Sequence, residues 1–106
     1  RGFFTSNSAM EFNSKWFREN LEGALIGYVF NYRRFPNGDF GSLDEVELEN
    51  ERYQGSIDYW ESGHLGIHLW DIQKEEDAMN VMLAPNQPSD KEAAITTLVQ
   101  LLMKCG

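Results

Sequence analysis

The sequence is poor in cysteine, in basic residues and in long apolar runs, and each shortage excludes a class of protein. Cys105 is the only cysteine among 106 residues, so the chain by itself can form neither an internal disulfide nor a thiolate metal cluster. No apolar run is long enough to cross a membrane, and residues 1–10 lack the sustained apolar stretch of an export signal. These shortages favour a cytoplasmic protein that is not anchored in a membrane.

The first residues of the chain differ in character from the rest. The chain begins with Arg1, and a small, polar stretch precedes Met10. We therefore expect residues 1–9 to be a leader or expression-derived segment, and Met10 to be the native start. Residues 10–106 are expected to form one domain, because a core of this size is typical of a single folding unit.

Acidic residues exceed basic ones and are concentrated in the middle of the chain. The formal net charge is −8, and residues 44–77 hold eleven acids but only Arg52 and Lys74 as basic residues. Such a field repels nucleic acid and anionic membranes, and it attracts basic molecules. We therefore expect a basic protein partner and no direct binding to nucleic acid or to a membrane. The alternative is that the acids only keep the protein in solution.

Apolar spacing predicts a helix near the N-terminus. It starts at Asn13 or Ser14, both suitable N-caps, and its apolar positions recur at steps of three and four: Phe17, Leu21, Leu25, Tyr28 and Tyr32. Gly23 and Gly27 disfavour a helix, so a strand over residues 23–33 remains open. Pro36, Asn37 and Gly38 predict a loop after this element.

A second helix is predicted for "PSDKEAAITTLVQLLMK", with Ser89 and Glu92 as a capping box. Its apolar stripe consists of Ile95, Leu98, Val99 and Leu102. Between the helices, "DEVELEN", "RYQGSIDYW", "HLGIHLWDI" and "DAMNVMLA" alternate or carry strand-forming residues, which predicts four strands. The sequence thus predicts an α+β fold: a four-stranded antiparallel β-meander with an N-terminal helix and a C-terminal helix packed on the sheet.

The turn "ESG" determines which residues of the second and third strands share a face. A two-residue loop would mix charged and apolar residues on both faces. A three-residue loop over residues 61–63 pairs Tyr59 with Leu65 and Ile57 with Ile67, which makes one face apolar. It also places Gly63 where the common turn needs a left-handed residue. We therefore expect the three-residue loop.

The opposite face of this hairpin then carries tryptophans among carboxylates. It holds Gln54, Ser56, Asp58, Trp60, His64, His68 and Trp70, next to Glu45, Glu47 and Glu49 of the neighbouring strand. Tryptophan anchors within a polar rim are typical of protein-binding surfaces. The alternative is that the N-terminal helix or the loop "FPNGDFGS" lies over this face and buries both indoles.

The two histidines do not form a recognisable catalytic or metal-binding motif. His64 and His68 lie four residues apart on a strand, about 13 Å along the backbone, which is too far for one metal ion. No nucleophile elbow, phosphate-binding loop or spaced ligand cluster accompanies them. We expect no catalytic residue, metal or cofactor. A His/carboxylate hydrolase is a minor alternative, and it requires His64, His68 and Asp58 to converge, with Glu61 as an acid.

The stretch "RYQGSIDYWESGHLGIHLWDIQKEEDAMNVML" resembles the immunity proteins of bacterial contact-dependent growth inhibition and polymorphic toxin systems, particularly the TriTu family. The resemblance rests on a strand ending in W-E-S-G, a second strand ending in an acidic residue, and an acidic turn. It is best over residues 44–103 and weak before Leu43. Trp70 before Asp71 and the "KEED" turn depart from the simple pattern, and toxin-specific contacts are expected there.

The resemblance implies a single immunity domain over residues 10–106, without catalysis, that binds the toxic C-terminal domain of a cognate effector and occludes its active site. It further implies that the toxin is a tRNA-cleaving ribonuclease, in a complex that can contain elongation factor Tu. We expect a monomer, and the expected toxin-binding residues are Glu45, Glu47, Glu49, Asp58, Trp60, Glu61, His64, His68, Trp70 and Asp71. The alternative from another class is an acidic adaptor or regulatory protein that binds another basic protein with the same face.

Overall fold

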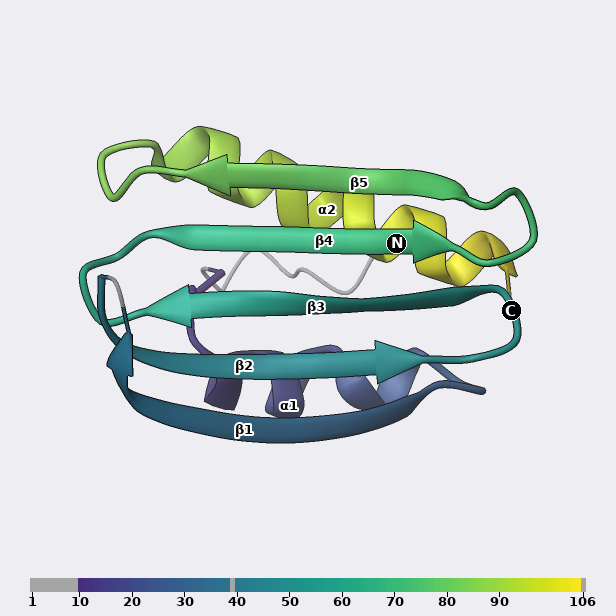
Figure 1. Ribbon diagram of the computed structural model, residues 1–106, viewed down its shortest axis with the longest axis horizontal. Helices are drawn as coiled ribbons and strands as arrows, with labels where there is room; N and C mark the ends of the chain where they lie inside the picture. The colour runs from purple at the N-terminus through teal and green to yellow at the C-terminus, as the bar shows by residue number, and fades with distance from the viewer. Residues whose placement is uncertain (1–9, 39, 106) are drawn as a thin grey trace.

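The computed structural model describes residues 10–38 and 40–105 of the chain. Its elements are α1 (Ser14–Asn20), the 3-10 turn η1 (Glu22–Ala24), β1 (Val29–Gly38), β2 (Gly41–Glu49), β3 (Tyr53–Trp60), β4 (Leu65–Asp71), β5 (Glu76–Leu83) and α2 (Pro88–Cys105). They form an α+β fold in which five antiparallel strands make one sheet with two α-helices packed against it (Figure 1). The expectation that residues 1–9 are a leader lies outside the described residues.

The sheet is a meander in which each strand pairs with its neighbours in the sequence, in the order β1-β2-β3-β4-β5. The predicted antiparallel meander is confirmed, but the predicted number of four strands is wrong. The additional strand is β1, in the region where the sequence left helix and strand open. Phe30 and Tyr32 alternate with more exposed residues along β1 and pack against the core, which is the period of a strand.

The N-terminal helix is shorter than its apolar spacing predicted. Asn13 caps it as expected, because its Oδ1 atom accepts a hydrogen bond of 2.7 Å from the N–H of Trp16. The helix ends at Asn20, and η1 follows it. Gly27 then adopts a φ of +92°, which glycine tolerates and other residues rarely do. This turn redirects the chain into β1, so Tyr32 belongs to the sheet.

The predicted loop at Pro36, Asn37 and Gly38 is also wrong, because these residues continue β1. β1 is an edge strand, and a proline there removes no hydrogen bond from the interior of the sheet. The pairing with β2 shifts register between Phe35 and Gly38, and β2 begins at Gly41. The edge position thus accommodates a residue that would break a central strand.

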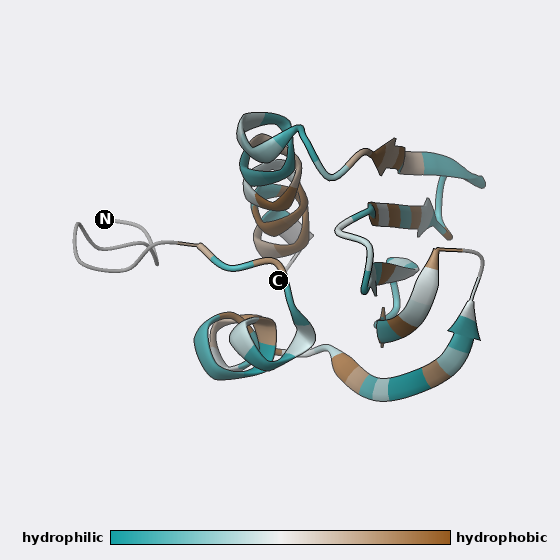
Figure 2. Cartoon of the chain, turned by 90° about the vertical axis from the view of Figure 1, so that its left-hand side faces the viewer, coloured by the Kyte–Doolittle hydropathy of each residue, from teal (hydrophilic) through white to brown (hydrophobic). Residues whose placement is uncertain are grey.

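Both helices cover the same face of the sheet, and the core lies between the two layers (Figure 2). The largest fully buried side chains come from both layers: Phe17, Leu21, Val46, Leu48, Ile57, Leu65, Ile67, Leu69, Ile95, Leu98 and Leu102. The predicted stripe of α2 is confirmed, since its four members are all buried. None of the helices in the described ranges is long and apolar enough to cross a membrane.

The start of α2 differs by two residues from the start that a Ser89 N-cap predicts. The helix begins at Pro88, and proline suits the first position of a helix because the N–H there has no intrahelical partner. The N–H of Lys91 donates to the carbonyl of Gln87 at 3.0 Å, which places Gln87 just before the helix. Ser89 and Glu92 therefore lie inside α2, and the predicted capping box is wrong.

The register of the β3–β4 hairpin is the predicted one. Ile57 lies opposite Ile67 and Tyr59 lies opposite Leu65, and all four side chains are buried in the core. The turn spans residues 61–63, and Gly63 has a φ of +99°, as the three-residue loop requires. The other face of the hairpin therefore points away from the helices.

Candidate protein-binding face

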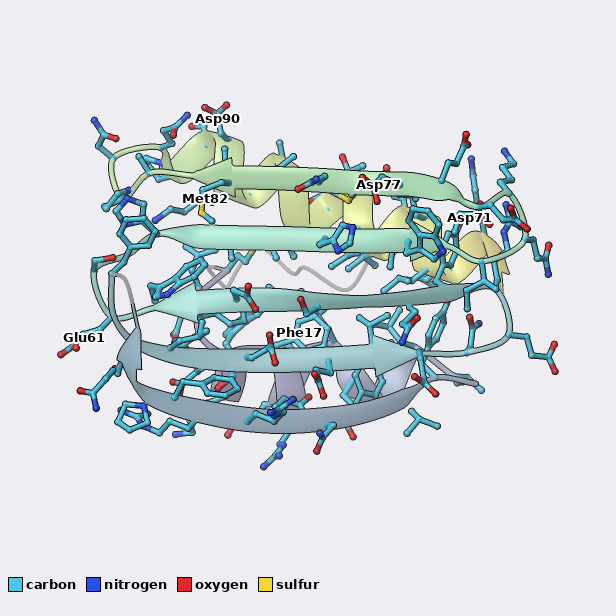
Figure 3. All side chains as sticks on the ribbon, in the orientation of Figure 1. Phe17, Glu61, Asp71, Asp77, Met82 and Asp90 are labelled. Atoms are coloured by element: carbon cyan, nitrogen blue, oxygen red, sulfur yellow. The ribbon has the colours of Figure 1, made fainter. Side chains whose placement is uncertain are left out.

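The sheet face opposite the helices is not covered by any element in the described part of the chain, and it points toward the reader in Figures 1 and 3. We call it the open face. The strand registers place on it Val29, Asn31 and Arg33 of β1, Glu45, Glu47 and Glu49 of β2, Gln54, Ser56, Asp58 and Trp60 of β3, Gly66, His68 and Trp70 of β4, and Asp77, Asn80 and Met82 of β5. Five carboxyl groups share this surface with one guanidinium group.

The alternative in which the N-terminal helix buries both indoles is wrong, because α1 packs on the opposite face. Trp70 is 37% exposed, and Trp60 is partly exposed. The loop alternative holds in part for Trp60: the Phe40 ring meets its indole edge-on at 5.4 Å between centroids, and a β-carbon at Gly38 would lie 3.2 Å from its Nε1 atom. The open face therefore presents one indole at each end.

An aromatic cluster forms the end of the open face next to the β3–β4 turn. Phe40 stacks on the imidazole of His64, with the ring centroids 4.1 Å apart, and also packs against Trp60. Trp60 lies over Gly66, where a β-carbon would come within 3.2 Å of its Cζ3 atom and 3.3 Å of Met82 Cε. Met82 is 54% exposed. This end thus combines a supported indole with an accessible methionine, and both are suited to hydrophobic contact.

Two carboxyl groups face each other at the centre of the open face. Glu45 of β2 and Asp58 of β3 are directly opposite in the ladder. Burial and the hydrogen bond that it shares with Asp58 raise the pKa of Glu45 to about 7. Burial also raises the pKa of Asp58 above its ordinary value. The two carboxyls therefore oppose each other's ionisation, and the doubly charged pair is disfavoured relative to two separate carboxyls.

Glu47, the next residue of β2 on this face, has a different environment. It accepts hydrogen bonds of 3.0 Å from Asn31 Nδ2 and from Arg33, both on β1. The bond from Asn31 and the guanidinium of Arg33 lower the pKa of Glu47. Glu47 is therefore ionised, but Arg33 partly neutralises its charge. The sequence did not reveal these two partners, because β1 was not assigned as a strand.

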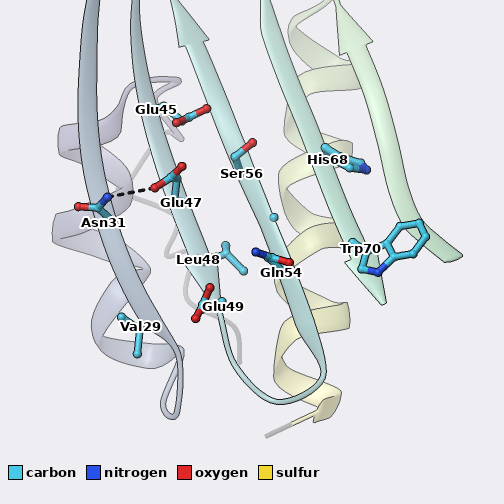
Figure 4. A pocket seen from close by; sticks show the side chains of 11 residues that line it. Val29, Asn31, Glu45, Glu47, Leu48, Glu49, Gln54, Ser56, His68 and Trp70 are labelled. Carbon is cyan, nitrogen blue, oxygen red and sulfur yellow. Dashed lines mark hydrogen bonds between the residues drawn. The ribbon is translucent and has the colours of Figure 1, made fainter. Parts of the chain in front are cut away.

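The other end of the open face contains a groove of about 530 Å³ between β1 and β4 (Figure 4). Glu45, Glu47 and Glu49 line it on one side, and His68 and Trp70 line it on the other. His68 Nε2 lies 2.8 Å from a carboxylate oxygen of Asp77 on β5, so this imidazole already has an acidic partner. The groove is thus negative on one wall and aromatic on the other.

Three of the predicted binding residues are not strand positions of the open face: His64 borders it in the β3–β4 turn, whereas Asp71 and Glu61 do not lie on it. Asp71 is only 3% exposed and forms a two-pronged ion pair with Arg52, with both N···O distances 2.9 Å. The hydrogen bonds from Arg52 lower the pKa of Asp71 to about 2. Glu61 lies in the β3–β4 turn, where its Oε1 accepts the N–H of Ser42. Asp71 therefore joins two loops from within the fold, and Glu61 fastens the turn to β2.

The cluster that a His/carboxylate hydrolase needs is not formed by the described side chains. His64 Nδ1 lies 2.7 Å from the hydroxyl of Ser62, His68 pairs with Asp77, and Asp58 pairs with Glu45. His64, His68 and Asp58 therefore do not converge as this alternative requires, and the carboxylate beside His68 is that of Asp77. Residues 10–38 and 40–105 also contain no group of three or more side chains arranged to hold a metal ion.

Lys91 supports the site from the helix side, a role that no sequence pattern indicated. Its ammonium is buried and donates hydrogen bonds to the carbonyls of Gly63, at 2.5 Å, and of Pro85, at 3.3 Å. The contact holds the β3–β4 turn against the start of α2. It fixes the position of the turn that carries His64.

Comparison with known proteins finds no relative of the chain. No family model matches it, and no curated protein or solved structure is significantly similar to it. The class of the protein therefore rests on its fold and its surface alone. These define an α+β domain with helices on one face of a five-stranded sheet and an acidic, aromatic surface on the other.

Proposed function

We propose that this chain is an immunity protein that binds and neutralises a cognate toxin domain of a contact-dependent growth inhibition system. The observation that carries the proposal is the open face, on which Trp60 and Trp70 lie among five carboxyl groups and no helix of the described residues covers them. A folded domain that leaves one whole sheet face to solvent, with large aromatics on it, has a surface suited to binding another protein.

The chemistry of the open face fits a nuclease toxin. A ribonuclease that cleaves transfer RNA presents lysines and arginines to a phosphate backbone. Glu45, Glu47 and Glu49 lie along one strand at alternate positions and offer negative charge over a similar surface. Occupation of the toxin's basic active-site cleft by this strand and its neighbours excludes the RNA both sterically and electrostatically.

The two kinds of side chain contribute to different steps of binding. Charges at the rim of an interface mainly accelerate association, whereas buried aromatic anchors slow dissociation. Fast capture suits an immunity protein, because a few turnovers of a toxin damage the cell. In the proposed setting the chain acts as a cytoplasmic monomer and is not an enzyme, and elongation factor Tu can take part in the complex with the toxin.

The proposal is tested with the product of the gene directly upstream, which should be a toxin that co-purifies with this chain. Isothermal calorimetry compares the wild type with Glu45→Lys/Glu47→Lys/Glu49→Lys and with Trp60→Ala/Trp70→Ala. Each variant should weaken toxin binding by more than about 1 kcal/mol, because each removes charge or anchors from the open face. Circular dichroism and thermal melting verify that the variants are folded.

The matched control reverses three exposed acids of the helix layer and its entry, Glu11, Glu19 and Glu92. It changes the net charge by the same amount but leaves the open face intact, so its affinity should remain within about twofold of the wild type. Equal losses in the two triple variants would mean that net charge alone drives binding. Unchanged affinity in every open-face variant would contradict the proposal, and capture of a basic protein other than the upstream product would favour the adaptor alternative.

A further inference from the structure

Within the described residues, no cation forms an ion pair with the central carboxyls of the open face, Glu45 and Asp58. Arg33 lies directly opposite Glu45 on β1, but its guanidinium forms an ion pair of 3.0 Å with Glu47. On the other side, Gly66 of β4 lies opposite Asp58 and offers no side chain. The Oδ1 atom of Asp58 is buried and receives no hydrogen bond from any residue of the described ranges. This carboxylate oxygen is therefore an unsatisfied acceptor within the described part of the chain.

The Trp60 indole lies directly beside this pair. Trp60 follows Asp58 by two residues on the same face of β3, and its six-membered ring covers Gly66, the residue opposite Asp58. A β-carbon at Gly66 would lie 3.2 Å from Cζ3 and 3.6 Å from Cη2 of the indole. On the opposite side, Glu45 also lines the groove that leads toward Trp70, and Figure 4 shows its carboxyl turned toward β3. The pair is thus bordered by an aromatic ring and by open space.

We propose that Glu45 and Asp58 receive the guanidinium group of an arginine from the basic partner, and that Trp60 packs beside it. This inference rests on the proposed function, because it names the side chain by which the toxin engages the open face. The remainder of the partner would extend along the groove between Glu49 and Trp70.

An arginine fits this place better than a lysine does. The planar guanidinium offers several N–H donors in a fixed geometry, so it can bond two adjacent carboxylates at once. It also packs favourably against an indole ring. A lysine ammonium is a compact and strongly hydrated charge without this geometry. The opposed carboxyls and the adjacent ring together therefore select a planar cation.

Arginine binding should be accompanied by release of a proton, because of the charges around the pair. Arg33 on β1 favours ionisation of Glu45, whereas Glu47 on β2 and Asp58 itself oppose it. His68 on β4 is the next titratable side chain on the face, and it is paired with Asp77 on β5. Because burial and the neighbouring acids raise the pKa of Glu45 to about 7, most molecules hold a proton on this pair at pH 6. A bound guanidinium favours the doubly charged pair and drives this proton off.

A small probe tests the arginine site without the toxin. Side-chain carboxyl resonances of Glu45 and Asp58 are followed by carbon-13 NMR from pH 4 to pH 9, alone and with N-acetyl-arginine amide or N-acetyl-lysine amide at equal ionic strength. The arginine probe should lower the midpoint of Glu45 by about one pH unit and shift the Trp60 indole signal, and the lysine probe should produce less than about half of this effect.

Two variants distinguish binding of arginine at Glu45 and Asp58 from a general attraction to acidic residues. Asp58→Asn should abolish the difference between the probes, whereas Asp44→Asn should retain it, because Asp44 pairs with Arg34 instead. Equal effects of the two probes, or no effect of arginine, would overturn the inference. So would a probe difference that persists in Asp58→Asn.

The number of protons released on binding is measured by calorimetry. The chain is titrated with the product of the upstream gene in two buffers of different ionisation enthalpy. Wild-type protein should release roughly one proton at pH 6 and almost none at pH 8, and it should bind about tenfold more tightly at pH 8. Glu45→Gln should lose the proton release, and His68→Gln, a control for histidine titration, should keep it. If the upstream product does not bind but arginine still shifts Glu45, the proposed function fails and the arginine site stands. If the product binds and Glu45→Gln changes neither the affinity nor the proton release, the arginine site fails and the proposed function stands.

Discussion

The two faces of the sheet differ in what their side chains do. The face toward α1 and α2 is formed by residues such as Ile57, Ile67 and Leu69, which are at most 2% exposed. The face away from the helices carries carboxyls, imidazoles and two indoles, and Trp70 and Met82 remain largely accessible. Successive residues of one strand thus belong to two different environments.

This difference shows where the fold is stabilised and where it is free to bind. Burial of apolar surface stabilises the helix-covered face and leaves it little room for change. The open face contributes less to stability, because its polar groups are solvated or pair with one another. It can therefore hold an arrangement that is unfavourable in the free protein, such as two adjacent carboxyls with one buried oxygen unpaired.

The sharpest contrast is expected between Ile57 and its neighbour Ser56, which point to opposite faces of β3. Ile57→Ala should lower the free energy of unfolding by about 3 kcal/mol, because it leaves a cavity between the sheet and the helices. Ser56→Ala should change it by less than about 0.5 kcal/mol. Urea denaturation measures both values. Similar losses in the two variants would show that the open face is as tightly packed as the core.

A smaller effect on stability is expected from pH at the open face. The pKa of Glu45 is raised in the folded protein to about 7, from an ordinary value of 4.5. The folded state then binds more protons than the unfolded state between these values, so stability should fall as pH rises from 4.5 to 7. Solvent screening at this partly exposed residue limits the loss to about 1 kcal/mol. Thermal melting from pH 5 to pH 8 tests this, and Glu45→Gln should flatten the profile. If the melting temperature of Glu45→Gln depends on pH as it does in the wild type, a group other than Glu45 causes the dependence.

Much of the helix-covered face could be predicted from sequence, because its patterns are local. The stripe of α2 and the turn residue Gly63 determine a helix and a register, and both are confirmed. β1 was harder, because Phe17, Leu21 and Tyr32 fall at helical spacing although the helix ends between them. Only the two-residue alternation of Phe30 and Tyr32 indicates the strand, and it is short.

It could be predicted which residues share the open face, but not which acids form ion pairs or hydrogen bonds. Alternation placed Glu45, Asp58, Trp60 and Trp70 on one face, and the register bears this out. The partners of Asp71 and Glu47 depend on a loop and on β1, which come close only in the folded chain. The bidentate pair of Asp71 with Arg52 shows why an acid in a charged segment is not always available to a partner.

The most direct test of the central claim places a bulky residue on each side of the molecule. Ser56→Trp fills the open face beside the groove, whereas Gln100→Trp adds the same side chain on the exposed side of α2. The affinity of each variant for the upstream gene product is measured by calorimetry after its fold is checked by circular dichroism. We expect Ser56→Trp to weaken binding at least about tenfold, because the toxin can no longer approach β3, and Gln100→Trp to stay within about twofold of the wild type. Loss of binding in Gln100→Trp with full affinity in Ser56→Trp would contradict the central claim.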